Sequence, residues 1–165
     1  MAIILAMVCG SALAQPVLSL GERAGQFNQG IPVYWPYHAL LMAVGFILLV
    51  TGVIVVRSRK TGTWYKSHMI LETIGGACIV AGLIVGIYMV ALSGLPHLRN
   101  IHEILGVIIG ILLIITIPLG YSIKPAHTSK KAIRVSHRWL GRISLVLMVI
   151  NILLGILFLS IILRR

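Results

Sequence analysis

Four long apolar stretches constrain the fold of this 165-residue chain more than any other feature. They run roughly over residues 37–56, 69–92, 101–121 and 140–163. A helix needs about 20 apolar residues to cross the hydrocarbon core of a bilayer, and each stretch meets that length. None shows the alternating pattern of a membrane β-strand. The sequence therefore predicts an all-α membrane protein whose residues 37–163 form a bundle of four transmembrane helices.

Composition and cysteine usage agree with a membrane protein. Hydrophobic residues make up 59% of the chain and charged residues only 10%, whereas soluble domains carry about a quarter charged residues. The two cysteines, Cys9 and Cys78, each lie inside an apolar run. Their positions exclude a disulfide framework, a CxxC zinc site and a CxxCH haem attachment. We therefore expect one integral membrane domain.

The residues before the first stretch divide into an apolar and a polar part. Residues 1–14 are apolar and end in the small-x-small sequence SALA, which resembles a signal-peptidase site but lacks a positive n-region. The segment is therefore a cleaved signal peptide or a retained short apolar segment. Residues 15–36 form a polar lead-in that ends in the aromatic sequence YWPY, which is typical of a membrane interface. We expect this lead-in on the extracytoplasmic side.

The positive charges predict how the chain is oriented. A net charge of +11 would suggest nucleic acid as a partner of a soluble chain. Here ten of the fourteen Lys and Arg lie in, or at the edge of, two loops, one between the first two stretches and one between the last two. The positive-inside rule places both loops in the cytoplasm and both termini outside. We expect a protein of the cell membrane that contacts lipid and no nucleic acid.

Four of the six histidines stand at or just before the start of an apolar stretch, one for each stretch. Ionisable residues inside a membrane are rare and are functional by default. Because successive helices alternate in direction, the histidines fall into two pairs: His38 with His102 near the outer face, and His68 with His137 near the inner face. Two imidazoles that face each other across a bundle suit haem iron. One shared four-histidine zinc site is excluded, because fourteen helical residues separate the levels by about 21 Å.

Small residues recur on the same helix faces as the histidines. One or two turns beyond a histidine, where a wide macrocycle needs room, the chain has Gly45, Gly76, Gly106 and Gly141. Fourteen residues beyond each histidine the same face reaches the level of the other pair, and the residues there are Gly52, Gly82, Thr116 and Asn151. Ordinary packing of membrane helices also favours glycine, so that explanation stays open for any one of these positions.

Four polar side chains are predicted beside the cofactors, and no catalytic residue is predicted. Asn151 is expected to hydrogen-bond a ligand imidazole or the haem edge, or alternatively a neighbouring helix. Glu72, one turn after His68, is expected to orient an imidazole or carry a proton near the inner haem, unless it is a plain snorkelling residue. Arg138 and Arg142 are expected to bind haem propionates, with a solvated charge as the alternative.

Short motifs surround the histidines. They read HALLM from His38, WYKSH up to His68 and HEILG from His102. The longest is SHRWLGR around His137, followed by VINILLG around Asn151. In this order, over residues 36–160, they resemble the cytochrome b561 superfamily, and in particular the four-helix core that some members join to a DOMON domain. The resemblance implies two haem b groups, with the ligand of the first helix paired to that of the third and the second to the fourth.

The chain also departs from the ascorbate-dependent animal and plant members of that superfamily, which have additional helices. Its first stretch ends in VVRSRK rather than in their motif YRVFR, and we expect no DOMON domain before the core. The redox partner is therefore expected to be a separate extracytoplasmic protein or a small-molecule electron donor or acceptor. The predicted function is transmembrane electron transfer through two bis-histidine haems. The sequence leaves open whether the chain is an enzyme.

Two other functions remain open at the level of the sequence. A quinol-oxidising membrane anchor would use the same haems, add a lipid-accessible quinone pocket beside Glu72 or Glu103, and pass electrons to a partner subunit. A non-redox protein would instead use the histidines as a path for metal ions or protons. Quinol-dependent reduction separates the two haem functions, and a b-type absorption spectrum separates both from the non-redox function.

Overall fold

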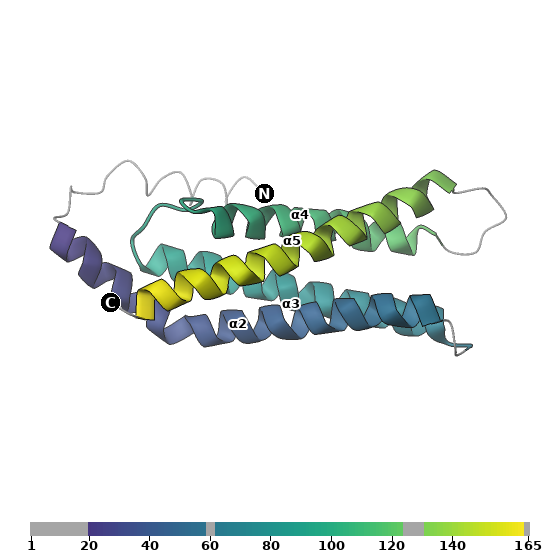
Figure 1. The fold of residues 1–165 in the computed structure, drawn as a ribbon, viewed down its shortest axis with the longest axis horizontal. Coiled ribbons are helices and arrows are strands. Elements are labelled where there is room, and N and C mark those ends of the chain that lie inside the picture. Colours follow the sequence, from purple (N-terminus) through teal and green to yellow (C-terminus); the bar gives the residue numbers. More distant parts are fainter. Residues whose placement is uncertain (1–19, 59–61, 124–130, 164–165) are drawn as a thin grey trace.

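The computed structural model describes residues 20–58, 62–123 and 131–163, with side chains described from residue 34 to residue 161 outside the two gaps. Four helices form almost all of this part of the chain: α2 (Leu20–Ser58), α3 (Trp64–Leu92), α4 (Ile101–Tyr121) and α5 (Lys131–Leu163) (Figure 1). The described ranges contain no strand. The apolar segment of residues 1–14 lies outside them.

All four helices are long and apolar enough to cross a membrane. The spans are Tyr34–Ser58, Trp64–Leu92, Ile101–Tyr121 and Lys131–Ile161. Many large apolar side chains point outward, among them Ile47, Leu153 and Ile156, each 62% exposed. In lipid such side chains are in an apolar solvent, and the helices satisfy their own backbone hydrogen bonds. The predicted all-α bundle of four spanning helices is confirmed.

Two helices begin well before the apolar stretches that predicted them. Helix α2 begins at Leu20 and α5 at Lys131, so the polar lead-in is helical over most of its length and both helices extend beyond the apolar stretches 37–56 and 140–163. Hydropathy detects the lipid-immersed part of a helix, whereas the backbone hydrogen bonds continue into polar sequence. In Figure 1 the first part of α2 runs at an angle to the rest. This helix contains Pro32 and Pro36, and proline lacks the main-chain donor that a straight helix needs.

The helices pack as two antiparallel hairpins, α2 with α3 and α4 with α5, while α2 and α5 touch only marginally (Figure 1). Glycine permits the closest approach within the first hairpin. A Cβ at Gly45 would lie 2.7 Å from Ile79 Cδ1 and 2.9 Å from the Gly75 carbonyl oxygen. A Cβ at Gly76 would likewise collide with the side chain of Ile117 in α4. Both Gly45 and Gly76, predicted beside a cofactor, therefore lie at helix–helix contacts.

A small apolar core occupies the middle of the bundle. Its buried members come from all four helices: Leu49, Ile79, Ile109, Leu113 and Met148. Along every helix these residues lie between the histidine and the position fourteen residues beyond it. Packed apolar side chains therefore fill the space between the two histidine levels.

The two ends of the bundle differ in their connections. Helix α2 ends and α3 begins at the same end at which α4 ends and α5 begins, and the α3–α4 connection lies at the opposite end (Figure 1). We call the end with the α3–α4 connection the outer end and the other the inner end. The inner end carries the basic side chains of Arg57, Lys66 and Lys131. That this end faces the cytoplasm stays a prediction from the positive-inside rule.

Candidate functional site

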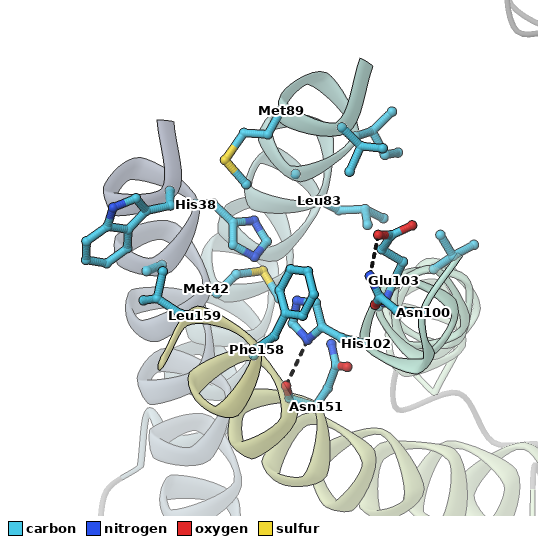
Figure 2. Close-up of a pocket in the computed structure, with 18 of the residues that line it drawn as sticks. His38, Met42, Leu83, Met89, Asn100, His102, Glu103, Asn151, Phe158 and Leu159 are labelled. Atoms are coloured by element: carbon cyan, nitrogen blue, oxygen red, sulfur yellow. Dashed lines mark hydrogen bonds between the residues drawn. The ribbon is translucent and has the colours of Figure 1, made fainter. Parts of the chain in front are cut away.

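The four histidines of the helices form two pairs, and each pair joins the two hairpins. At the outer end the ring centroids of His38 and His102 lie 6.2 Å apart with the ring planes at 79°. At the inner end the ring centroids of His68 and His137 lie 6.3 Å apart with the planes at 81°. Figure 2 shows the outer rings facing each other, with Phe158 beside them. The two pairs thus share one geometry.

Each imidazole is fixed by a hydrogen bond from Nδ1 to a main-chain carbonyl of the other helix in its hairpin. The four hydrogen bonds measure 2.8 Å from His38 to Gly82 and 3.0 Å from His68 to Gly52, from His102 to Asn151 and from His137 to Thr116. A carbonyl only accepts, so Nδ1 must carry the proton. The other ring nitrogen, Nε2, makes no hydrogen bond within the described residues and keeps its lone pair for a metal ion.

The four residues whose main-chain carbonyls accept these hydrogen bonds each lie fourteen residues beyond a histidine of the same helix. Because the His68 ring is level with Gly52 on α2, the two pairs are separated along that helix by about 21 Å. The sequence suggested that small or polar side chains at these positions make room for a cofactor. In the structure their main-chain carbonyls make the contact.

Three glycines that were not predicted from the sequence lie directly against histidine rings. A Cβ would lie 2.8 Å from His102 Cε1 at Gly155, 2.9 Å from His137 Cε1 at Gly120 and 3.1 Å from His38 Nδ1 at Gly86. Each glycine follows an accepting carbonyl by four residues, which is about one helical turn. A spacing of eighteen residues between histidine and glycine was the signal in the sequence that could have identified them.

A cavity of about 460 Å³ surrounds the outer pair (Figure 2). Its size falls within the range of about 300–1,000 Å³ that is common for ligand pockets. All four helices and the α3–α4 connection line it, and the walls are mostly apolar, with Met42, Leu83 and Phe158 near the rings. Gly106 is also part of the lining. The outer end of the bundle therefore has room for a ligand between the two imidazoles.

Asn151 lies in this cavity wall and is 3% exposed. A hydrogen bond joins Asn151 to the His102 imidazole, but the main-chain oxygen of Asn151 makes it. The hydrogen bond predicted for the side chain stays a prediction. The side-chain oxygen Oδ1 is buried without a hydrogen-bond partner. Leaving such a group unpaired costs about 1–3 kcal/mol. The lining therefore has an unused hydrogen-bonding position, which fits a cavity that takes a partly polar ligand.

At the inner pair, the carboxylate of Glu72 lies against His68. Its Oε1 atom is 3.5 Å from His68 Nδ1, the same nitrogen that donates to the Gly52 carbonyl. Oε1 is buried without a hydrogen-bond partner, and so is the hydroxyl oxygen of Tyr65. A Cβ at position 52 would lie 2.5 Å from Oε1, so glycine there leaves room for the carboxylate.

Thr116 and Gly141, also predicted beside the inner cofactor, contact each other. The Thr116 hydroxyl donates to the Leu112 carbonyl at 2.6 Å, so the side chain is engaged within α4 and only its carbonyl serves His137. A Cβ at Gly141 would lie 3.9 Å from Thr116 Cγ2, an ordinary contact. Neither of these two side-chain contacts involves a histidine ring.

Arg138 and Arg142 lie on the exposed surface of α5. The Nε atom of Arg138 donates to the Arg134 carbonyl at 3.3 Å. The guanidinium of Arg142 lies 5.5 Å from the centroid of the Trp139 ring, and that ring is 58% exposed. Both contacts are to other residues of α5, and both arginines are exposed, which agrees with the alternative of solvated charges. Binding of propionates by the two arginines stays a prediction.

Glu103 has a different role from Glu72, because both of its carboxylate oxygens are paired. One accepts from the Arg99 main-chain nitrogen at 3.0 Å and the other from the Asn100 side chain, whose own oxygen accepts from the Glu103 nitrogen. These hydrogen bonds cap the N-terminus of α4, where Asn100 is the N-cap residue. Glu103 also lines the cavity around the outer pair, with its carboxylate oxygens already engaged at the start of α4, and a quinone pocket there stays a prediction.

The histidine pairs fit haem iron better than a structural metal ion. Within the three described ranges no group of three or more His, Cys, Asp or Glu could hold a metal ion, whereas structural zinc takes four protein ligands. Two metal–nitrogen bonds of about 2 Å and the half-widths of two imidazole rings span about 6 Å, which matches the spacing of both pairs. A bis-imidazole arrangement supplies the two axial ligands that haem iron takes in a helical bundle.

A bundle of spanning helices that sets imidazoles in facing pairs is the architecture of a membrane haem protein. The family model described as eukaryotic cytochrome b561 matches residues 37–162. The chain therefore belongs to the cytochrome b561 family, as its motifs predicted. It is an integral membrane protein that binds haem b and mediates electron transfer across the membrane. Searches of curated proteins and of solved structures found no match.

Proposed function

We propose that the chain binds two haem b groups, one between His38 and His102 and one between His68 and His137, and connects the two faces of the membrane for electron transfer. The observation that supports this most strongly is the repetition of one geometry. Both ring pairs have nearly the same spacing, 6.2 and 6.3 Å. Their levels differ by about 21 Å along a bilayer core of about 30 Å.

The protein contributes preorganised ligands. Haem b, when bound, supplies an iron that takes up and releases one electron. The four main-chain carbonyls hold the imidazoles in one tautomer and one orientation, so binding requires little rearrangement of the rings. Apolar walls around the outer pair exclude water, which affects the reduction potential of an enclosed metal centre.

An external redox partner would reach the proposed outer haem through the α3–α4 connection. His97 and Arg99 of the α3–α4 connection are exposed and also line the cavity around the outer pair. A separate protein or a small molecule that contacts this connection would come near the outer haem. In the proposed orientation this end is extracytoplasmic, both termini lie on the same side, and the membrane is the plasma membrane.

Haem stoichiometry tests the proposal. The purified protein should show a b-type absorption spectrum and contain two haems per chain when the haem is extracted and counted. One haem per chain would contradict the pairing of all four histidines, and the absence of haem would favour a path for metal ions or protons. Rapid reduction by a quinol, with none by water-soluble donors, would favour the quinol-oxidising anchor.

A further inference from the structure

The structure assigns Glu72 the role of a positioning residue that makes the inner site differ from the outer one. Its carboxylate, held against His68 from one turn along α3, makes this imidazole a stronger electron donor and lowers the reduction potential of the inner site relative to the outer site. The inference rests on the proposed function, because it takes His68 as a ligand of the inner haem.

Glu72 is the residue one helical turn after His68, and the three other histidines have no acidic residue at the equivalent position. One turn after His38, His102 and His137 the chain has Met42, Gly106 and Gly141, none of which has a carboxylate. Only His68 is followed at this spacing by an acidic residue. The asymmetry therefore distinguishes one of four otherwise similar ligand positions.

The surroundings are adapted to hold the carboxylate there. Position 52 is glycine, and a side chain at that position would collide with Glu72 Oε1. Each of the other three histidine rings has a glycine against it, four residues beyond the carbonyl that accepts its hydrogen bond. For His68 the accepting carbonyl is that of Gly52, and the residue four positions beyond it on α2 is Val56. Oε1 itself has no hydrogen-bond partner and lies 3.5 Å from His68 Nδ1. No other described contact competes for it.

Physical chemistry gives the direction of the effect. A carboxylate beside the N–H of a metal-bound imidazole raises the basicity of that ligand. Inside a bundle the interaction is stronger than in water, because the effective dielectric constant is lower. A more basic ligand stabilises the oxidised metal more than the reduced one. The inner site should therefore have the lower midpoint potential, and electrons should settle at the outer site.

Potentiometric titration of Glu72→Gln tests the inference. The amide keeps the size of the side chain and removes the carboxylate, while the Gly52 carbonyl still holds His68. We expect a higher midpoint for the inner site, measured alone in a His102→Ala background, and no change of the outer site in a His68→Ala background. Glu103→Gln is the matched control, because that carboxylate is paired within the α4 cap and should leave the inner midpoint unchanged.

The outcomes are distinguishable from failure of the proposed function. An inner midpoint that stays the same or falls, with both haems present, would overturn the role of Glu72 and leave the two-haem proposal intact. Loss of the inner haem in Glu72→Gln would also overturn it, because tuning is not needed for retention. Glu72→Ala is the second variant and must raise the midpoint as well. A wild-type protein without two haems would instead contradict the proposed function.

Discussion

The outer and inner histidine pairs have the same framework but different surroundings. In both, the rings are about equally spaced and every Nδ1 donates to a main-chain carbonyl. Around the outer pair, Gly86 and Gly155 lie against the rings and Asn151 has an unpaired side chain. Around the inner pair, Gly120 lies against one ring and Glu72 beside the other.

This difference separates what holds the imidazoles from what tunes them. Main-chain carbonyls are present whatever the side chain, so the orientation of the rings depends on helix register rather than on residue identity. The neighbouring side chains vary between the two ends, and they are the groups that can give the sites different affinities and potentials. Substitutions should therefore affect the sites one at a time.

Removal of a ligand should have the largest effect. His102→Ala should abolish the outer haem and lower the haem content to about half, with the inner site spectrally intact, because its ligands lie about 21 Å away. His68→Ala should do the reverse. Haem extraction and low-temperature optical spectra check both variants. Loss of both haems from either single variant would mean that the sites are not independent.

Replacing a glycine that lies against a histidine ring with alanine should have the next largest effect. In Gly155→Ala the new Cβ would lie 2.8 Å from His102 Cε1, so the ring must move, at a cost of about 1–3 kcal/mol. We expect weaker retention of the outer haem, by about tenfold for each 1.4 kcal/mol. Competition with apo-myoglobin measures this retention.

The same experiment at the other end sharpens the comparison. Gly120→Ala should weaken the inner site alone, since its Cβ would lie 2.9 Å from His137 Cε1. Gly62→Ala is the control, because no atom lies within 4 Å of its Cβ. Equal losses from both sites in either Gly155→Ala or Gly120→Ala would indicate general destabilisation instead of a local contact.

Asn151 should show a smaller effect on the outer site. In Asn151→Ala the main-chain carbonyl still holds His102, so we expect both haems to remain. A hydrogen bond between the proposed outer haem and Asn151 Oδ1, which has no partner within the protein, would be lost, and retention of the outer haem should weaken by about 1–3 kcal/mol. Thr116→Val is its inner counterpart and should change little, because the hydroxyl donates within α4. Competition with apo-myoglobin compares the two, and an unchanged outer site would show that the Asn151 side chain has no role there.

The surface arginines should have the smallest effect. Arg138→Gln and Arg142→Gln remove charges from the exposed face of α5, where surface substitutions usually change stability by less than about 0.5 kcal/mol. We expect haem content and both midpoints to stay at wild-type values. A selective loss of the inner haem in either variant would instead support the predicted contact with propionates.

Much of the architecture could be predicted because its signals are local. Hydropathy located the four spans, and the alternation of helix direction predicted which histidines share a level. The start of α2 at Leu20 could not be predicted in this way, because polar residues outside the lipid give no hydropathy signal.

The details of the sites depend on contacts between helices. The positions of Gly82 and Asn151 were predicted to be level with the outer pair, but every residue has a carbonyl, so the sequence could not indicate which ones accept. Gly155 was missed for a similar reason, since its contact with His102 depends on the register between α4 and α5. Arg138 was predicted from its charge and its position beside His137, and binding of a propionate by it stays a prediction.

Electron transfer in proteoliposomes tests the central claim most directly. A membrane-impermeant reductant is added outside vesicles that contain an impermeant oxidant, and reduction of the trapped oxidant is followed with wild-type protein and with His102→Ala and His68→Ala. Two sites in series predict that the wild type reduces the oxidant and that either single substitution stops the reaction. Continued reduction by either variant at the wild-type rate would contradict the claim that both histidine pairs lie on the path.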